Sequence, residues 1–416
     1  MNTTATFISN AIIDHIFDVR HSSYHQLKEI FGVDILDELS NYLRREQDEK
    51  FQERVDELLE DSNIEKKIAE LVARGSIFSK SSRSSHSKST LCKLFYGTNR
   101  EPNDANDHSK GYGNRRAREL YTGTCTVSIP KTHKKGQIKG SLWQKLIQWD
   151  ASYGDLELKE TLHLQEGEFW DRINELFAPL VSEEKQALIF IHGYNTSFEE
   201  ASIRAAQLAV DLAHPGITAF FSWPSKGKLL GYLSDEASIQ YSEEYIADFL
   251  TKFAKHTEVE RIHIIAHSMG NRGLLEAINI IHRRSPEIAF GQIILAAPDV
   301  DADVFHQKAE AYTLVSEQTT LYISSKDKAV HASEWIHSYS RAGFTPPVSV
   351  VNTIDTIKVE QDVDLLQLGH GYFAEHKGLL EDMSKLMSTN LHAEYRDKLS
   401  TEITKDTSQR YWKLKV

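Results

Sequence analysis

The sequence predicts an α/β protein: a mostly parallel sheet covered by helices on both faces, with a helical N-terminal extension. Between residues 187 and 387, short continuous apolar runs alternate with longer segments whose apolar residues recur every three or four positions. Strands that are apolar on both faces and separated by helices are typical of a parallel sheet buried on both sides. Residues 1–78, by contrast, show helical spacing only and contain no proline.

Length, charge and cysteine content narrow the class of protein. The chain has 416 residues, more than most single cores hold, so one large domain with an appended segment is expected. Its net charge of −12 and the lack of a P-loop pattern disfavour nucleic-acid or nucleotide binding. The N-terminal residues do not follow the signal-peptide pattern, and we expect no spanning helix, so the predicted location is cytoplasmic. Cys92 and Cys125 are expected to be free thiols.

The chain is expected to divide into four parts. Residues 1–78 form the helical extension, and residues 79–90, mostly serine with basic residues, are typical of a linker. Residues 91–390 form the main domain, and residues 391–416 a C-terminal tail. Because the apolar stripes of the extension must be buried, it is either a packing appendage or a module that docks on a partner.

The main domain is expected to begin with two strands, a helix and a long loop at 101–118, and then to alternate strictly. The expected strands cover residues 92–100, 125–129, 187–191, 218–223, 262–266, 292–296, 321–324 and 348–354. The expected helices cover residues 166–177, 198–212, 235–253, 271–280, 303–314, 329–339 and 372–387. In such sheets ligands bind beyond the carboxyl ends of the strands, so chemistry is sought there.

A nucleophile is expected at Ser268. The apolar run that ends at Ala266 turns within about two residues into a helix, which leaves the residue at the turn crowded and its side chain projecting outward. This arrangement is the nucleophile elbow, G-x-S-x-G, present here as Ala266-His-Ser-Met-Gly270. Alanine in the first position still meets the demand for a small residue.

A serine hydroxyl needs a base to remove its proton, and the base needs a carboxylate to hold its tautomer. In proteins with this elbow the catalytic residues usually follow one another in the sequence as serine, acid and histidine. The acid and the histidine are therefore expected at the ends of later strands. Asp327 follows the strand expected at 321–324, and His370 stands between two glycines before the last helix. The alternatives left open are, for the acid, Asp299 and Asp301, and, for the base, His376 and His331.

Acyl transfer also requires preorganised donors for the oxyanion. The Met269 N–H, directly after the nucleophile, is one expected donor. The other is the Tyr194 N–H in Ile191-His-Gly-Tyr-Asn195, where Gly193 permits a tight turn after a strand. The candidate substrate-contacting side chains are Asn195, Trp223, His267 and Asp299, although an aromatic residue at a strand end is often a packing residue.

Residues about 91–390 resemble the α/β-hydrolase superfamily, and more narrowly an uncharacterised bacterial esterase- and lipase-like branch of it. The motifs of the resemblance are Phe95-Tyr-Gly-Thr-Asn-Arg100, Ile191-His-Gly-Tyr-Asn195, Ser222-Trp-Pro-Ser-Lys-Gly227 with Gly231-Tyr and Asp235, Ala266-His-Ser-Met-Gly-Asn271, Ala297-Pro-Asp-Val-Asp301 and Leu368-Gly-His-Gly-Tyr-Phe373. The resemblance implies serine-hydrolase chemistry on an ester, thioester or lipid, without a metal or organic cofactor. It does not identify the substrate and does not cover residues 1–90.

The sequence therefore predicts a serine hydrolase that cleaves an ester or related acyl bond through Ser268, His370 and Asp327 and an acyl-enzyme intermediate. Two alternatives stay open. One is a lipase or phospholipase that acts at membranes and is localised or oligomerised by its N-terminal helices. The other is a binding or scaffold protein whose hydrolase fold has lost turnover. The expected partners are a small-molecule or lipid ester and, through the N-terminal helices, a membrane surface, a second copy or another protein.

Overall fold

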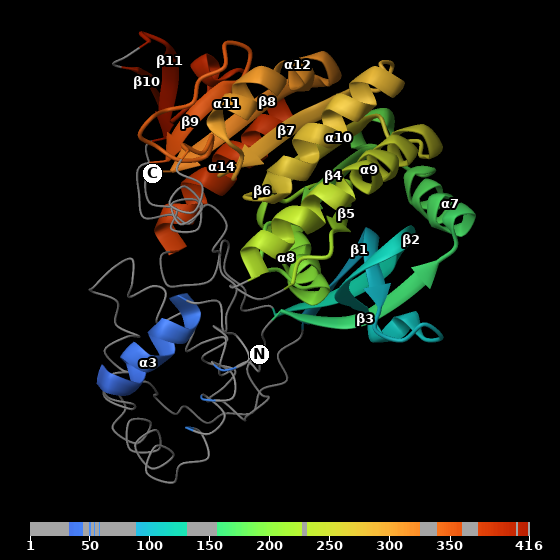
Figure 1. Ribbon diagram of the computed structural model, residues 1–416. Coiled ribbons are helices and arrows are strands. Elements are labelled where there is room, and N and C mark those ends of the chain that lie inside the picture. The colour runs from blue at the N-terminus through green and yellow to red at the C-terminus, as the bar shows by residue number, and fades with distance from the viewer. Residues whose placement is uncertain are drawn as a thin grey trace, which may run out of the picture. The chain divides into compact units, whose positions relative to one another are not determined.

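The chain forms two compact units, and the computed structural model describes part of each (Figure 1). The described residues are 33–44, 50, 54, 58, 89–130, 156–226, 231–324, 339–359, 373–404 and 407–414. The first unit comprises Met1–Ser87, Gly140–Tyr153 and Lys228–Leu233, and the second comprises Lys88–Lys139, Gly154–Gly227 and Ser234–Val416.

The first unit contains helix α3 (Val33–Arg44). Leu36 and Leu39 lie one helical turn apart and are fully buried. Outside α3, Arg54 is also helical, and its Nε donates to Glu38 Oε2 over 3.2 Å. A helical extension over the whole of residues 1–78 is not shown, because most of that segment lies outside the described residues.

The second unit is built around an eleven-stranded sheet with the order β10-β11-β9-β8-β7-β6-β4-β5-β1-β2-β3 (Figure 1). The strands are β1 (Ser89–Pro102), β2 (Tyr112–Pro130), β3 (Glu157–Leu164), β4 (Gln186–Ile191), β5 (Ile217–Ser222), β6 (Arg261–His267), β7 (Phe290–Ala296), β8 (Ser316–Ser324), β9 (Asp355–Val359), β10 (Leu399–Ile403) and β11 (Arg410–Leu414). From β1 to β11 every pair of neighbours is parallel. The antiparallel pairs lie toward the two edges: β1 with β2, β2 with β3, and β10 with β11. The mostly parallel sheet confirms the expected architecture.

Helices cover both faces of this sheet. They are α7 (Glu166–Phe177), α8 (Phe198–Asp211), α9 (Tyr232–His256), α10 (Gly270–Arg284), α11 (Ala302–Lys308), α12 (Glu310–Val315) and α14 (Phe373–Thr389). Apolar residues of α8 and α14 share one core cluster with Phe220 of β5. Its neighbour Phe221 points to the opposite face, where its ring lies 5.8 Å from that of Phe249 in α9. Helix α10 packs closely against α9 at Gly273, where an added Cβ would collide with Ile239.

The central strands end level with one another at their carboxyl ends. Ile191 of β4 pairs with Phe221 of β5 and with Ala266 of β6, and Ala266 pairs with Leu295 of β7. All residues of β7 are buried, as its continuous apolar run predicts. The loops after β4, β5, β6 and β7 therefore leave the sheet along a common edge.

The strand expected at 348–354 is not formed, and this prediction was wrong. Residues 351–354 form a turn, in which the Ile354 N–H donates to Val351 O over 2.9 Å. The strand is instead β9, where Thr356, Ile357 and Val359 are buried. Asn352 and Thr353 are polar residues that interrupt the apolar run and favour a turn, so the strand begins after them.

The segment 391–416, expected to be a tail, contributes β10 and β11 to the sheet. β11 pairs parallel with β9 and antiparallel with β10, and Leu414 is buried. β1 likewise begins at Ser89, inside the expected linker, and β2 begins inside the expected loop at 101–118. The helix expected at 329–339 lies almost entirely outside the described residues. None of the described helices has an apolar stretch long enough to span a bilayer.

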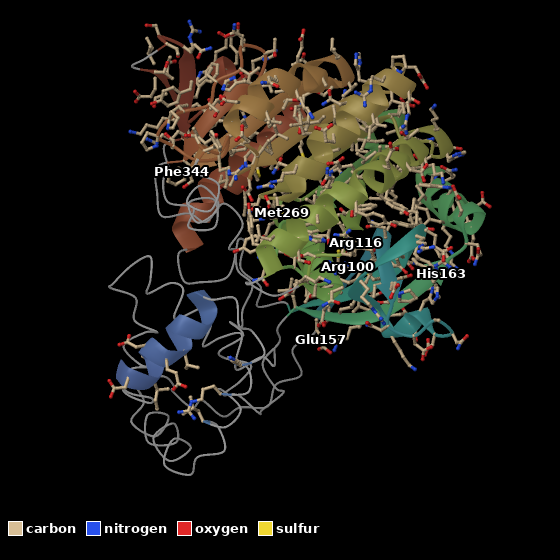
Figure 2. The ribbon with its side chains drawn as sticks, in the orientation of Figure 1. Arg100, Arg116, Glu157, His163, Met269 and Phe344 are labelled. Carbon is tan, nitrogen blue, oxygen red and sulfur yellow. The ribbon has the colours of Figure 1, made fainter. Side chains whose placement is uncertain are left out.

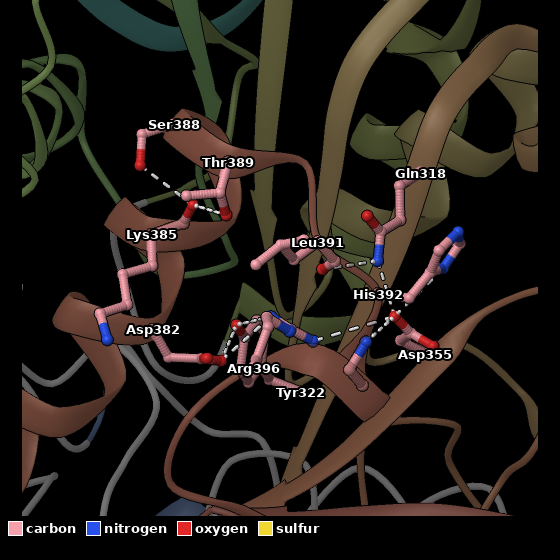
Figure 3. Close-up of polar contacts among 11 residues, drawn as sticks. Gln318, Tyr322, Asp355, Asp382, Lys385, Ser388, Thr389, Leu391, His392 and Arg396 are labelled. Carbon is pink, nitrogen blue, oxygen red and sulfur yellow. Dashed lines mark hydrogen bonds and ion pairs between the residues drawn. The ribbon is translucent and has the colours of Figure 1, made fainter.

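A buried polar cluster attaches the C-terminal elements to β8 (Figure 3). The Tyr322 hydroxyl donates to Asp382 Oδ2 of α14 over 2.6 Å, and Arg396 Nη1 lies 3.1 Å from the same oxygen. Arg396 Nη2 lies 4.0 Å from Asp355 Oδ2 at the start of β9, and Gln318 Nε2 donates to that oxygen over 2.6 Å. These contacts join β8, β9 and α14 through side chains.

Candidate active site

Ser268 has a left-handed backbone, with φ of 48°, at the turn between β6 and α10. A non-glycine residue there costs about 1–3 kcal/mol, so its surroundings must hold it. The Ser268 N–H donates to Ala296 O over 3.0 Å, and Ser268 O accepts from the N–H groups of Asn271 and Asp299, both over 3.1 Å. Backbone from β7 and α10 thus fixes the strained turn, which has the conformation of a nucleophile elbow.

Two glycines allow other segments to approach this turn. A Cβ on Gly270 would lie 2.4 Å from His192 O, so α10 begins directly against the end of β4. A Cβ on Gly193 would lie 2.9 Å from His267 Nδ1 and 3.1 Å from Ser268 Cβ. The loop after β4 therefore passes in contact with Ser268, and only glycine leaves room for it.

The Ser268 side chain is buried yet unpaired. Ser268 is 2% exposed, and its Oγ has no hydrogen-bond partner among the described residues. His267 Nε2 is likewise unpaired within the described part of the chain. Burial, with a smaller effect of the Arg204 charge, lowers the pKa of His267 to about 3. His267 is therefore neutral at pH 7, and no described histidine bonds the Ser268 hydroxyl.

The two expected oxyanion donors, Met269 and Tyr194, each stand next in sequence to a residue of this turn or of the loop beside it. The Met269 N–H, at the N-terminus of α10, donates to no acceptor among the described residues (Met269 is labelled in Figure 2). Tyr194 directly follows Gly193, where an added Cβ would lie 3.1 Å from Ser268 Cβ. Asn195 then adopts a left-handed φ of 54°, and its N–H donates to Asp235 Oδ2 over 3.2 Å. The Asp235 carboxylate thus fixes the loop through the backbone N–H of Asn195.

Trp223, a candidate substrate contact, supports this loop instead. It has no exposed surface, its Nε1 donates to His192 O over 2.8 Å, and its ring stacks on that of His192 at 5.0 Å. His192 Nδ1 lies 2.7 Å from Gly193 O, which makes the Nδ1–H tautomer the bonded form. Trp223 and His192 therefore hold the turn at Gly193 from within the core.

The alternative acids each have other partners. Asp299 Oδ1 lies 3.2 Å from Arg272 Nη2 and 3.5 Å from Arg341 Nε, all in buried or half-buried surroundings. Asp301 Oδ1 accepts from the N–H groups of Asp303 and Val304 and caps α11. Both carboxylates thus have structural roles, and Asp299 does not present a free carboxylate to a substrate.

Asp327 and His370, the expected acid and base, lie outside the described residues, as do His331 and the His376 side chain. The strands before the first two are described: β8 ends at Ser324 and β9 ends at Val359.

Sequence reasoning gave no role to four charged residues that shape this edge: Arg100, Asp235, Arg272 and Arg341. Each bonds residues far away in the chain, so no local spacing marks it. The available signal was that Arg100 and Asp235 both belong to the motifs that carry the family resemblance.

Three comparisons bear on this geometry. Residues 172–388 match the family model described as alpha/beta hydrolase of unknown function (DUF900). Uncharacterized protein alr1448 from Nostoc sp. is 30% identical over 112 residues, which cover 21% of this chain and 29% of that protein. The chain therefore spans less than a third of that relative's length.

Two solved structures are similar at low identity. A chain assigned as a cell surface hydrolase from Lactobacillus plantarum is 12% identical with a TM-score of 0.30, covering 48% of this chain and 90% of that chain. Carboxyl esterase 2 from Tuber melanosporum is 9% identical with a TM-score of 0.27, covering 64% of this chain and 83% of that chain.

The family match spans more than half of the chain and includes β4 to α14, with the elbow at Ser268. It confirms the resemblance to α/β hydrolases. The protein belongs to the family of alpha/beta hydrolases of unknown function, DUF900.

Proposed function

We propose that the protein is a serine hydrolase that cleaves an ester or related acyl bond, with Ser268 as its nucleophile. The observation that carries this proposal is the combination at Ser268 of a left-handed φ, a buried hydroxyl without a partner among the described residues, and a glycine loop in contact with its Cβ. Buried polar groups are nearly always bonded, and unsatisfied ones are often functional. A strained, unpaired hydroxyl next to the Met269 amide at the helix N-terminus suits acyl transfer.

We assign the base to His370 and the acid to Asp327. Their support is topological: β6, β7, β8 and β9 are consecutive parallel neighbours, so the segments after β8 and β9 leave the sheet at the edge that carries Ser268. Neighbouring strands lie about 4.8 Å apart, which puts β9 about 14 Å from β6. An extended residue spans about 3.3 Å, so the residues between Val359 and His370 suffice to reach Ser268.

In the proposed reaction, Ser268 Oγ attacks the acyl carbonyl carbon while His370 takes its proton. The Met269 and Tyr194 amides donate to the oxyanion of the tetrahedral intermediate. When the intermediate collapses, the leaving group receives the proton from His370, and the acyl group remains on Ser268. A water molecule, deprotonated by His370, then releases the acid and restores the free hydroxyl.

A series of p-nitrophenyl esters with acyl chains of increasing length tests this function on the full-length protein. We expect turnover that Ser268→Ala abolishes and that Ser388→Ala, at an exposed serine of α14, leaves unchanged. The chain length with the highest kcat/KM separates a small-ester hydrolase from one that acts on lipids. Turnover that persists in Ser268→Ala would remove the assigned nucleophile, and no turnover of any ester would favour a binding protein with a hydrolase fold.

A further inference from the structure

We infer that Arg100 and Asp235 are positioning residues of the oxyanion hole: together they fix the loop 192–196, which carries Tyr194, against Ser268. The inference rests on the proposed function, since it assigns these residues a role in the same acyl-transfer site. Neither residue belongs to the elbow or the assigned triad. Arg100 lies near the end of β1 and is labelled in Figure 2, and Asp235 lies in the first turn of α9.

Arg100 is 1% exposed, and each of its five N–H groups has an acceptor. Nε donates to Ser222 Oγ (2.8 Å), Nη1 to Gly113 O (3.0 Å) and Ser225 O (3.1 Å), and Nη2 to Thr196 O (2.7 Å), with His192 Nε2 at 3.4 Å. No donor is left for a substrate. The guanidinium therefore binds protein only and joins the loop after β4 to the loop after β5.

Asp235 has no exposed surface and bonds the same two loops from α9. Its Oδ2 accepts from the Asn195 N–H (3.2 Å) and the Ser225 hydroxyl (2.5 Å), and its Oδ1 accepts from the Lys226 N–H (2.7 Å). The Ser225 Oγ in turn accepts from the Thr196 N–H over 3.1 Å. One buried carboxylate thus fixes backbone amides in both loops.

The two charged groups hold the loop on both sides of Tyr194. Arg100 binds before it, at His192, and after it, at Thr196, while Asp235 binds the Asn195 amide between them. The charges are opposite and buried within the same small region, so each compensates the other without direct contact. Tyr194, whose amide is proposed to donate to the oxyanion, lies between these fixed residues.

Burial and the charge of Arg100 together favour the neutral form of His192. Burial, followed by the adjacent Arg100, holds the pKa of His192 well below its usual range, so the imidazole is neutral. A neutral ring can donate from Nδ1 to Gly193 O and accept from Arg100 at Nε2. Burial lowers the pKa of Arg100 to about 9, which leaves it charged at pH 7. Burial and the charge of Arg100 thus both favour the neutral imidazole, which is the form that bonds the turn at Gly193.

The test compares Arg100→Lys with Arg396→Lys in the full-length protein. Both changes replace a buried guanidinium by an ammonium with three donors, but Arg396 lies in the cluster around Tyr322. The readouts are kcat and KM on the best p-nitrophenyl ester, the rate at which a fluorophosphonate modifies Ser268, and the thermal unfolding midpoint. Loss of one oxyanion donor lowers kcat by about 100-fold or more.

We expect kcat and the fluorophosphonate rate of Arg100→Lys to fall together by about 100-fold, with KM close to wild type. Arg396→Lys should lower the unfolding midpoint and keep the wild-type kcat. Asp235→Asn serves as a second variant: its amide keeps one acceptor but cannot accept at both oxygens, so its kcat should fall less than that of Arg100→Lys.

A folded Arg100→Lys protein with wild-type kcat would overturn the inference. So would a loss of kcat in Arg100→Lys that Arg396→Lys reproduces at the same loss of stability. If Arg100→Lys does not fold, wild-type kcat in Asp235→Asn overturns it alone. Failure of the proposed function is seen separately, because the wild-type protein would then neither turn over esters nor react with the fluorophosphonate.

Discussion

Two buried arginines in the same unit are used in different ways. Arg100 binds backbone carbonyls, a hydroxyl and an imidazole, and among the described residues it has no carboxylate within ion-pair distance. Arg396 binds carboxylates: its Nη1 lies 3.1 Å from Asp382 and its Nη2 lies 4.0 Å from Asp355. Its Nε has no hydrogen-bond partner in the described part of the chain, whereas Arg100 has no unused donor.

The difference follows from what each arginine holds. Arg396 binds side-chain carboxylates of α14 and β9, and so links whole elements of the fold (Figure 3). Backbone carbonyls belong to the loops themselves, so a guanidinium that binds them sets the position of individual peptide groups. We therefore expect Arg396 to contribute to stability and Arg100 to the geometry beside Ser268.

The largest effect that separates the two regions is expected from Gly193→Ala. The added methyl group would lie 3.1 Å from Ser268 Cβ and 2.9 Å from His267 Nδ1, so the loop must move away from Ser268. We expect kcat to fall by about 100-fold with little change in KM, because the proposed oxyanion donor Tyr194 would be displaced. Gly167→Ala is the matched control, since a Cβ there meets nothing within 4 Å. Equal kcat values for both variants would contradict the role of the loop.

A substitution in the cluster around Arg396 should lower the free energy of unfolding without changing turnover. Arg396→Lys loses donors to Asp382 and Tyr322 and should lower the free energy of unfolding by about 1–3 kcal/mol. Urea unfolding followed by tryptophan fluorescence measures this loss, and ester turnover measured below the transition should match the wild-type protein. A large loss of kcat in this variant would show that the two regions are not separate.

The fold was predictable where strands are buried on both faces. β4 to β7 are continuous apolar runs, and their helices carry clear apolar stripes. β3, β10 and β11 lie toward the edges, where exposed residues break the pattern, as the half-exposed alternation of Leu399–Ile403 shows. The strand expected at 348–354 was misplaced because the apolar residues Val348, Val350 and Val351 precede a turn and do not form a strand.

The candidate site was predictable only in its local parts. The elbow at Ser268 and the turn at Gly193 are short motifs whose spacing reflects backbone geometry. Arg100, in contrast, bonds Thr196, Ser222 and Ser225, which are 96, 122 and 125 positions away. Such contacts depend on the order of strands in the sheet, which no local pattern records. The partners of Asp299 were missed for the same reason.

A further prediction concerns a buried histidine, His263, which loses its charge on burial whereas the two buried arginines keep theirs. Burial, followed by the charges of His214 and Arg261, lowers the pKa of His263 to about 3. In the unfolded chain a histidine has a pKa of about 6.5, so below that pH His263 is protonated in the unfolded chain. In the folded protein it stays neutral down to a lower pH, and acid therefore favours unfolding. Stability is therefore full above pH 6.5 and falls by about 1.4 kcal/mol per pH unit toward pH 3 for this residue.

His263→Gln should remove that contribution while Arg100 and Arg396 stay charged throughout. Urea midpoints at pH 7 and pH 5 check it: the difference between them should be smaller in His263→Gln than in the wild-type protein. An unchanged difference would mean that other groups cause the acid sensitivity.

The assignment of Ser268 as nucleophile is tested most directly by mapping where a fluorophosphonate attaches. After reaction of the full-length protein at pH 7, proteolysis and mass spectrometry should find the phosphonyl group on the peptide that contains Ser268, with one group per chain. Ser268→Ala should carry none, and Ser388→Ala should react like the wild-type protein. A phosphonyl group on any other residue, or an unmodified wild-type chain, would contradict the account.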